Sequence, residues 1–285
     1  MMFADLHLHT FFSDGTYSPE ELVDRASKGG FSAMSLTDHD TVEGCARTAA
    51  ACNAANIEFI TGSELTAQHE EHEIHILGYF IDTANPALLS EIEKFQVVRQ
   101  NRIREIVARL NTLGIPLESQ AVFDLANCRS PGRPHVARAL VQAGIVSSLD
   151  EAFERFLKKN RPAFVPKFKM SASVAIDLIH EAGGLAVLAH PGLNHADEVI
   201  RPMAEAGLDG IECFHTKHST SMSEHYLEIA DRLKLLVTGG SDCHGMNKGK
   251  PLIGTIKLPY QHVERLKEEV KLRNLNHRGT ETQRL

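Results

Sequence analysis

The chain has 285 residues, of which 42% are hydrophobic and 24% are charged, as in an ordinary globular protein. That length allows one large domain or two modest ones, and the sequence has neither an apolar run long enough to span a membrane nor the layout of a signal peptide. A net charge of −7 excludes a protein that coats long nucleic acid, and five cysteines without a C-x-x-C pair indicate reduced thiols, so we expect a cytoplasmic protein with no membrane partner.

Strand-like and helix-like segments alternate along the chain, which indicates an α/β fold. We expect strands at 3–8, 32–37, 58–66, 73–80, 185–189, 210–214 and 235–238. After the first strand, Ser18, Pro19 and Glu21 predict a capped helix start, and Gly29 with Gly30 predicts its end. Seven strands with crossover helices fit a barrel of parallel strands, whose chemistry lies on loops at the carboxyl ends of the strands.

The middle of the chain differs, because from about residue 94 to 169 it shows helical periodicity and little strand signal. We therefore expect a small helical domain at 99–169 that caps the substrate and is inserted between the barrel segments 1–98 and 170–285. Residues 94–169 hold fourteen Lys and Arg against six Asp and Glu, whereas the remainder holds sixteen against thirty-one. The acidic body suits cations and the basic insert suits an anion, although a merely solvated helical surface is the simpler alternative.

Two histidines, His7 and His9, stand two residues apart in an alternating polar and apolar run. In a strand both would point to one face, with Leu6 and Leu8 packed behind them, and neutral imidazole is a common metal ligand. Further histidines and carboxylates stand at or near the ends of later strands, namely Asp14, His39, Glu64, His75, His190, Asp242 and His244. A structural hydrogen bond explains any one of them, but not all together. Since one ion takes about four to six ligands, nine such groups could serve two or three metals.

These motifs resemble the polymerase and histidinol phosphatase (PHP) family of metal-dependent phosphoesterases. The resemblance rests on DLHLHT (5–10), SDG (13–15), LTDHD (36–40), GSE (62–64), EIH (73–75), AHP (189–191) and GSDCHG (240–245). It runs through nearly the whole chain. It implies a distorted (β/α)7 barrel with a multinuclear metal centre at one end.

The resemblance also implies how the ligands divide among three metals. The first metal would be held by His7, His9 and Asp242. Glu64 would bridge this metal to a second one, whose other ligands would be His75 and His190. The third metal would be held by Asp14, His39 and His244. The set contains nitrogen and oxygen ligands and no Cys, so it is compatible with Mn, Fe or Zn, of which we expect manganese.

For the chemistry, no Ser-His-Asp order, reactive Cys or P-loop stands out, so the expected nucleophile is a metal-bound hydroxide. Specificity is expected from the basic insert, where Gly-Arg-Pro-His at 132–135 opens a helix whose N-terminus suits an anion. His218 is a candidate to contact substrate or protonate the leaving group, and a supporting role beside the metals is an equal alternative. The candidate phosphate contacts in the insert are Arg133, His135, Arg99, Arg102 and Arg161. Arg133 could instead form a surface ion pair, and Arg161 could simply be solvated.

Among PHP proteins, a stand-alone chain with such an insert resembles the phosphatases that act on nucleoside 3′,5′-bisphosphates. We therefore expect hydrolysis of the 3′-phosphate to give a nucleoside 5′-monophosphate and phosphate, with a small anionic nucleotide or the end of a short oligonucleotide as substrate. Three alternatives stay open: a 5′–3′ exonuclease on short RNA, a histidinol phosphatase, and a non-catalytic metal-binding regulatory module.

Overall fold

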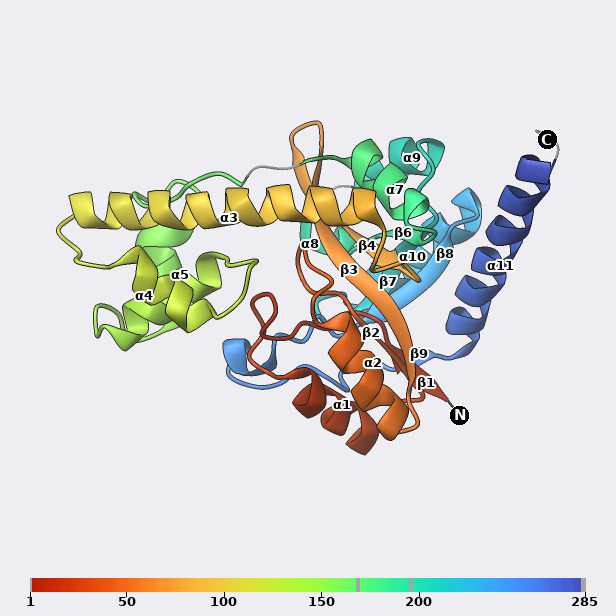
Figure 1. The fold of residues 1–285 in the computed structure, drawn as a ribbon, viewed down its shortest axis with the longest axis horizontal. Coiled ribbons are helices and arrows are strands. Elements are labelled where there is room, and N and C mark those ends of the chain that lie inside the picture. Colours follow the sequence, from red (N-terminus) through yellow and green to blue (C-terminus); the bar gives the residue numbers. More distant parts are fainter. Residues whose placement is uncertain (1, 168–169, 195–196, 283–285) are drawn as a thin grey trace.

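The computed structural model describes residues 2–167, 170–194 and 197–282, and within these ranges the strands form one mixed sheet (Figure 1). The strand order is β8-β7-β6-β4-β3-β2-β1-β9, with β5 paired to β3. All seven expected strands are present, and two short ones, β5 and β9, were not expected. The strands are β1 (Phe3–Asp5), β2 (Ala33–Leu36), β3 (Glu58–His69), β4 (His72–Tyr79), β5 (Met170–Ser171), β6 (Leu185–Leu188), β7 (Gly210–His215), β8 (Leu236–Gly240) and β9 (Leu258–Pro259).

The chain beside β1 meets β8 at the other side of the sheet, which nearly closes the sheet into a barrel. The chain just after β1 hydrogen-bonds to the end of β8 and the residues beyond it: Leu6 N–H donates to Gly239 O at 3.1 Å, and His9 N–H donates to Cys243 O at 3.0 Å. Apolar side chains, including Leu6, Leu77 and Tyr79, fill the interior. The segment that carries His7 and His9 therefore takes part in closing the barrel, although only its first residues form a regular strand.

The expectation of an all-parallel barrel is wrong for β4, which runs antiparallel to both β3 and β6. The reason lies in the link between β3 and β4, which consists of Glu70 and Glu71 between the paired residues His69 and His72. Two residues close a hairpin, whereas a parallel connection needs a crossover of about a dozen residues or more.

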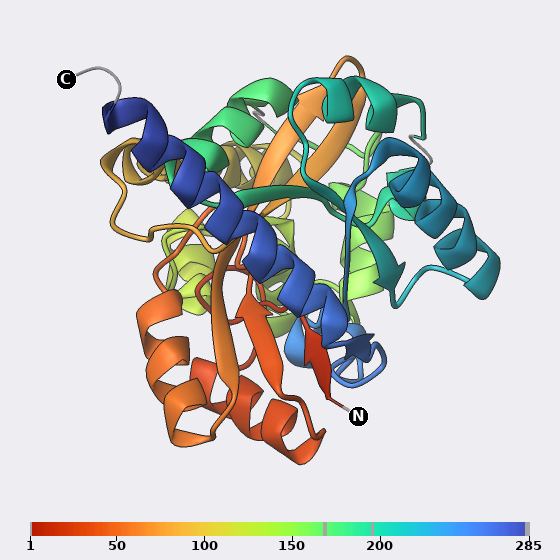
Figure 2. The same ribbon diagram turned by 90° about the vertical axis from the view of Figure 1, so that its right-hand side faces the viewer.

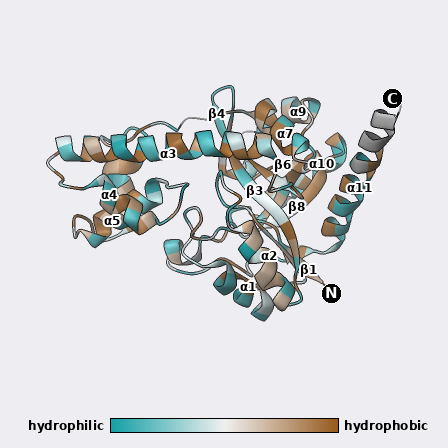
Figure 3. Cartoon of the chain, viewed as in Figure 1, coloured by the Kyte–Doolittle hydropathy of each residue, from teal (hydrophilic) through white to brown (hydrophobic). Residues whose placement is uncertain are grey.

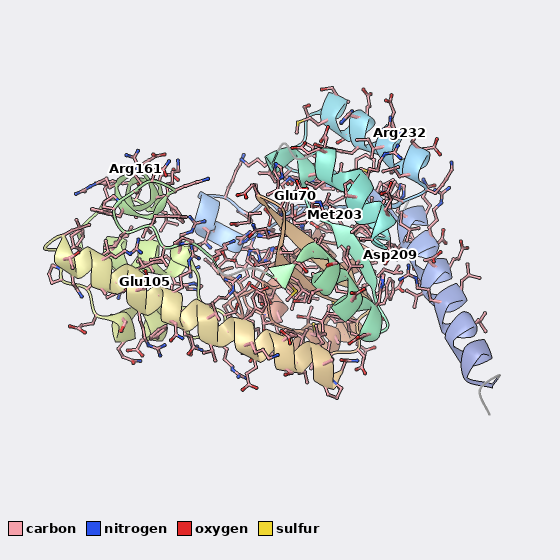
Figure 4. The ribbon with its side chains drawn as sticks, turned by 90° about the horizontal axis from the view of Figure 1, so that it is seen from above. Glu70, Glu105, Arg161, Met203, Asp209 and Arg232 are labelled. Carbon is pink, nitrogen blue, oxygen red and sulfur yellow. The ribbon has the colours of Figure 1, made fainter. Side chains whose placement is uncertain are left out.

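Helices surround the barrel, and α11 covers the end that faces the viewer in Figure 2. Val263 and Leu266 of α11 are fully buried against the interior core. Asp209, labelled in Figure 4, lies on the side of the barrel next to α11 and forms an ion pair with Arg273 of that helix. The helices are α1 (Pro19–Lys28), α2 (Cys45–Ala54), α3 (Pro86–Thr112), α4 (Ser119–Ala126), α5 (Arg133–Gln142), α6 (Leu149–Ala152), the π-turn η1 (Phe153–Leu157), α7 (Ala172–Glu181), α8 (Pro191–Asn194), α9 (Asp197–Glu205), α10 (Thr220–Leu233), the 3₁₀-turn η2 (Gly245–Lys248) and α11 (Gln261–Thr282).

The predicted start of α1 is confirmed in detail. The Ser18 hydroxyl accepts the Glu21 N–H at 3.1 Å, and the Glu21 carboxylate accepts the Ser18 N–H at 2.8 Å. Both bonds satisfy donors that the first helical turn would otherwise leave unpaired. The helix ends with Gly29 at its C-terminal cap, as the glycine pair predicts.

The long helix α3 belongs to two separate hydrophobic cores. Leu88, Ile92 and Phe95 pack in the core of the barrel, whereas the stripe at 103, 106, 107 and 110 packs against α4 and α5. Figure 1 shows α3 reaching from the barrel to this helical group, and Figure 3 shows hydrophobic residues in both places. The core thus changes between Phe95 and Ile103, inside one continuous helix. The exact bounds of an inserted domain at 99–169 stay a prediction.

None of the helices in the described ranges combines the length and the apolar character that crossing a membrane requires.

Candidate metal centre

The nine residues expected to bind metal converge at one edge of the barrel. They come from the closing segment after β1, from the loop at 11–17, from β3 and β4, and from the segments that follow β2, β6 and β8. Among the described residues, the same nine make up every group of at least three candidate ligands whose atoms lie within 4.8 Å of one another. Segments more than 230 positions apart in the sequence thus meet at one place, as in the hydrogen bond between Asp242 N–H and His7 O at 2.9 Å.

Glu64 stands at the centre of the cluster, and its side chain is fully buried. Imidazoles surround both of its carboxylate oxygens. Oε2 lies 3.3 Å from Nε2 of His7 and of His9 and 3.0 Å from Nδ1 of His39, while Oε1 lies 2.7 Å from His75 Nδ1 and 3.0 Å from His190 Nε2. A carboxylate in this position can reach more than one ion, as expected of a bridging ligand.

The observed groups only partly follow the division implied by the family resemblance. His7, His9 and Asp242 form one group, and Asp14, His39 and His244 form another that His9 joins. The implied set of Glu64, His75 and His190 does not form a single group. Instead, His190 shares Glu64 with His7, and His75 shares it with His39.

Several buried polar atoms of the cluster have no hydrogen-bond partner among the described residues. They include His9 Nε2, Asp14 Oδ1 and His39 Nδ1, which lie close to other groups of the cluster but without the geometry of a hydrogen bond. A buried polar atom left without a partner costs about 1–3 kcal/mol, so their concentration at one place calls for a ligand. Imidazole nitrogens and carboxylate oxygens facing a common centre fit divalent cations.

The electrostatics of the cluster favour the ligand forms of its carboxylates. Burial would raise the pKa of Glu64, but His39, His75 and His7 outweigh it and hold that pKa well below its usual range. Burial would likewise raise the pKa of Asp14, but His244 and other nearby histidines outweigh it and hold that pKa well below its usual range. Burial lowers the pKa of His39 to about 4. At neutral pH these carboxylates are therefore ionised and His39 is neutral, as metal binding requires.

Glu212 on β7 is a buried acid that the sequence analysis missed. Its carboxylate accepts a hydrogen bond from His7 Nδ1 at 3.1 Å and another from the His190 backbone N–H at 2.8 Å. The bond at Nδ1 leaves His7 Nε2 directed at Glu64 and Asp242. The signal that could have revealed it is an acidic residue within an otherwise apolar buried strand.

A second missed acid, Asp38, anchors the loop that carries Asp14. Its Oδ1 accepts the Thr10 N–H at 2.7 Å and the Ser13 hydroxyl at 2.6 Å, and its Oδ2 accepts the Thr10 hydroxyl at 2.5 Å. Asp38 is almost fully buried. The LTDHD motif contains it, but the motif alone did not separate its role from that of His39.

The candidate phosphate contacts of the insert occupy different environments. Arg99 bonds to Asp40, with Nε 2.7 Å from Oδ2, and Arg102 donates to the Val165 carbonyl at 2.8 Å and 2.9 Å. Arg133 donates to Leu157 O at 3.2 Å, and its guanidinium lies 5.8 Å from the ring centre of Phe164. These arginines are wholly or largely withdrawn from solvent.

The other two candidate phosphate contacts, His135 and Arg161, differ in their exposure to solvent. His135 is buried and accepts the Gly132 N–H at its Nδ1, and burial lowers its pKa to about 4. Arg161 lies on the insert side of the molecule (Figure 4), is 49% exposed and pairs with Glu154 at 3.5 Å. His135 is thus part of the start of α5, whereas Arg161 lies at the surface.

Lys167 connects the basic residues of the insert to the cluster. Its Nζ lies 3.5 Å from His75 Nε2 and 2.9 Å from a Glu73 oxygen. Burial lowers the pKa of Arg102 to about 9, and repulsion from Arg133 and Arg99 adds to this effect. These cations are therefore close enough to repel one another, and they form a partly buried positive region beside the nine-residue cluster.

His218 lies next to the loop that follows His190. Its Nδ1 donates to the Cys213 carbonyl at 3.0 Å, and its Nε2 accepts the Gly192 N–H at 3.2 Å. Both ring nitrogens thus bind backbone and hold the His190 loop against β7. Contact with substrate or protonation of a leaving group stays a prediction for this residue.

Known proteins resemble this chain over most of its length. The sequence profile of the PHP domain matches residues 5–160. The 3′,5′-nucleoside bisphosphate phosphatase of Chromobacterium violaceum is 35% identical over 88% of this chain and 90% of its own, and a 5′-3′ exoribonuclease of Haemophilus influenzae is 36% identical over 84% and 89%. The crystal structure of a putative metal-dependent phosphoesterase from Bifidobacterium adolescentis matches with a TM-score of 0.86 and 33% identity, covering 93% of this chain and 95% of the other.

Proposed function

Since the chain belongs to the PHP domain family, we propose that it is a metal-dependent phosphomonoesterase that removes the 3′-phosphate of nucleoside 3′,5′-bisphosphates. The products are a nucleoside 5′-monophosphate and inorganic phosphate. The observation that carries the proposal is the convergence of nine His, Asp and Glu side chains at one edge of the barrel, beside a partly buried positive region.

The proposed metal ligands are the nine residues of the cluster, which would hold two or three divalent ions, with manganese the expected metal and iron or zinc as alternatives. Bound at this place, such ions supply two things that phosphate ester hydrolysis needs, a water acidic enough to ionise near neutral pH and positive charge beside the phosphoryl oxygens. The protein itself directs His7 Nε2 at the cluster through Glu212 and keeps the carboxylates ionised.

The basic residues of the insert favour a substrate with two phosphates. One phosphate would lie at the metal cluster, and the second would be met by Arg133, Arg99 and Arg102, with Lys167 between the two places. Arg99 already pairs with Asp40, so it adds less net positive charge than Arg133. His135 would support this contact through the start of α5, and Arg161 would contribute only at the rim.

A phosphate-release assay on a panel of substrates tests the proposal. The panel contains a nucleoside 3′,5′-bisphosphate, the matching 3′- and 5′-monophosphates, and histidinol phosphate, each with Mn²⁺ and with a chelator. We expect the highest kcat/KM on the bisphosphate, a 5′-monophosphate as product, and no turnover with chelator or in the His7→Ala variant. Equal rates on simple monophosphates would contradict the bisphosphate assignment, and preferred turnover of histidinol phosphate would replace it.

A 5′–3′ exonuclease activity on short RNA is the second candidate. The similarity to the Haemophilus influenzae exoribonuclease favours it, and so does the basic insert, which could hold the phosphate of a chain end as well as that of a nucleotide. Short 5′-phosphorylated RNA, incubated with the wild type and with His7→Ala, distinguishes the two activities by the appearance of mononucleotides. Metal binding without turnover of any of these substrates would leave the regulatory module as the explanation.

A further inference from the structure

The ligand groups of the metal centre differ in what holds them in place. Glu64 and His75 lie on paired strands, and Glu212 binds both His7 and the His190 backbone. Asp14 instead lies on the irregular loop at 11–17, outside the sheet. It belongs to just one of the ligand groups found among the described residues, together with His9, His39 and His244.

The insert holds this loop from outside the barrel. Arg138, on α5, donates from Nη2 to the Asp14 carbonyl oxygen at 2.6 Å. The side-chain amide of Asn247, at η2, donates to the same oxygen. Nearby, the Cys128 thiol donates to the Ser13 carbonyl at 3.3 Å. The peptide that carries the Asp14 carboxylate is thus fixed between α5 and η2.

The environment of Arg138 suits a fixed contact. The side chain is partly buried, and burial lowers its pKa while the Asp14 carboxylate opposes that effect. Asp14 Oδ1 in turn lies 3.1 Å from His244 Nε2 and 3.9 Å from His39 Nε2. A guanidinium that fixes the Asp14 peptide therefore also fixes the distance between this carboxylate and its two histidine neighbours.

We infer that Arg138 is a positioning residue for one metal ion of the centre, the ion held by His9, Asp14, His39 and His244. This inference rests on the proposed metal centre and adds to it that the insert, through α5, completes one of the binding sites. Groups that position metal ligands typically change affinity by about 10- to 100-fold when they are removed. The other ligand groups do not include Asp14 and keep their ions.

The test counts the Mn²⁺ ions bound by the full chain after removal of its metal and titration back. The variants are Arg138→Ala, Asp14→Ala as the reference for loss of this one ion, Arg138→Lys as the conservative change, and Arg155→Ala as the matched control. Arg155 is a half-exposed arginine of the same insert that pairs with Glu151 at 2.6 Å. We expect Arg138→Ala to weaken by about 10- to 100-fold the same ion that Asp14→Ala loses. Arg138→Lys should retain more affinity, and Arg155→Ala should match the wild type.

Thermal unfolding with and without Mn²⁺ separates positioning from general destabilisation. A positioning role reduces the rise in Tm caused by Mn²⁺, whereas a purely structural role lowers Tm equally in both conditions and overturns the inference. Unchanged titration of Arg138→Ala, or equal weakening of every ion, also overturns it. If Arg138→Ala fails to fold, Arg138→Gln takes its place with the same expectations. A wild type that binds no Mn²⁺ contradicts the proposed function itself, which distinguishes the two failures.

Discussion

The Glu212 carboxylate lies 3.1 Å from His7 Nδ1 and leaves the opposite ring nitrogen of His7 facing Glu64 in the nine-residue cluster. Both side chains are fully buried, so water does not compete for the hydrogen bond that orients the His7 ring. An amide in place of this acid would lose the charge that holds the His7 N–H. We therefore expect Glu212→Gln to weaken Mn²⁺ binding by about 10- to 100-fold, measured by isothermal titration. The exposed Glu205→Gln serves as control, and equal affinity of both variants would show that Glu212 has no such role.

Metal binding is expected to depend on pH through His9. Burial would lower the pKa of His9, but the carboxylates of Asp242 and Glu64, each with an oxygen 3.3 Å from His9 Nε2, outweigh it and raise the pKa to about 9 in the metal-free protein. His9 is therefore protonated at neutral pH before metal binds, and an ion must displace that proton. We expect the affinity for Mn²⁺ to rise from pH 6 to about pH 9, with release of protons detectable in buffers of different ionisation enthalpy. Affinity independent of pH would contradict this assignment.

The same raised pKa predicts how the metal-free protein responds to alkali. The folded pKa of about 9 exceeds the usual value of 6.5, so protonated His9 contributes stability that is fully present below about pH 6.5 and is lost as the pH rises through about 9. Metal-stripped protein should therefore lose Tm between pH 7 and pH 9.5. The Mn²⁺-loaded protein should lose less, because the ion replaces the proton. An equal loss in both forms would assign the alkaline transition to other groups.

Arg133 is expected to recognise the second phosphate of the substrate. Hydrogen bonds to charged groups contribute about 1.5–3 kcal/mol, so Arg133→Ala should lower kcat/KM on a nucleoside 3′,5′-bisphosphate by about 10- to 100-fold. Turnover of the matching 3′-monophosphate should change little, because it lacks the phosphate that Arg133 meets. Arg161→Ala is the comparison within the insert, and its exposed side chain predicts an effect below about 3-fold. Equal losses on both substrates would indicate that Arg133 supports the fold instead.

Gly240 is expected to tolerate no side chain. A Cβ at this position would overlap the His7 Cβ and backbone nitrogen where β8 and the closing segment meet. Overpacking of this kind costs about 1–3 kcal/mol, so Gly240→Ala should lower the free energy of unfolding by that amount in urea denaturation. Ser90→Ala, at an exposed position of α3, is the control. Similar stability of the wild type and Gly240→Ala would show that this contact can relax.

The sequence predicted where the strands lie and which nine residues meet, because both depend on local patterns. Alternation marks a strand, and residues at equivalent ends of strands are brought together by the barrel. The expected strands at 58–66 and 73–80 left only the six residues 67–72 between them, too few for a parallel crossover, so the reversal of β4 was predictable from the sequence. The division of ligands among metals was not predictable in the same way. Whether His190 groups with His7 or with His75 depends on how the side chains lie around Glu64 in the folded barrel, which the spacing of residues along the chain does not encode.

Glu212 shows a different limit of the sequence. The sequence of a strand does not show whether a single acidic residue faces solvent or an interior histidine. For Glu212 that follows only from the register of β7 against its neighbouring strands. The basic insert was predictable only in part. Its net charge could be counted from the sequence, whereas the pairing of Arg99 with Asp40 depends on how α3 packs on the barrel.

Because α3 is one continuous helix anchored in two cores, it connects the barrel rigidly to the helices α4 and α5. Twenty-seven residues of helix extend about 40 Å and resist bending, so the placement of these helices relative to the barrel is preorganised when the chain folds. A molecule that contacts both the barrel and these helices therefore meets a binding site of fixed dimensions instead of one that closes around it.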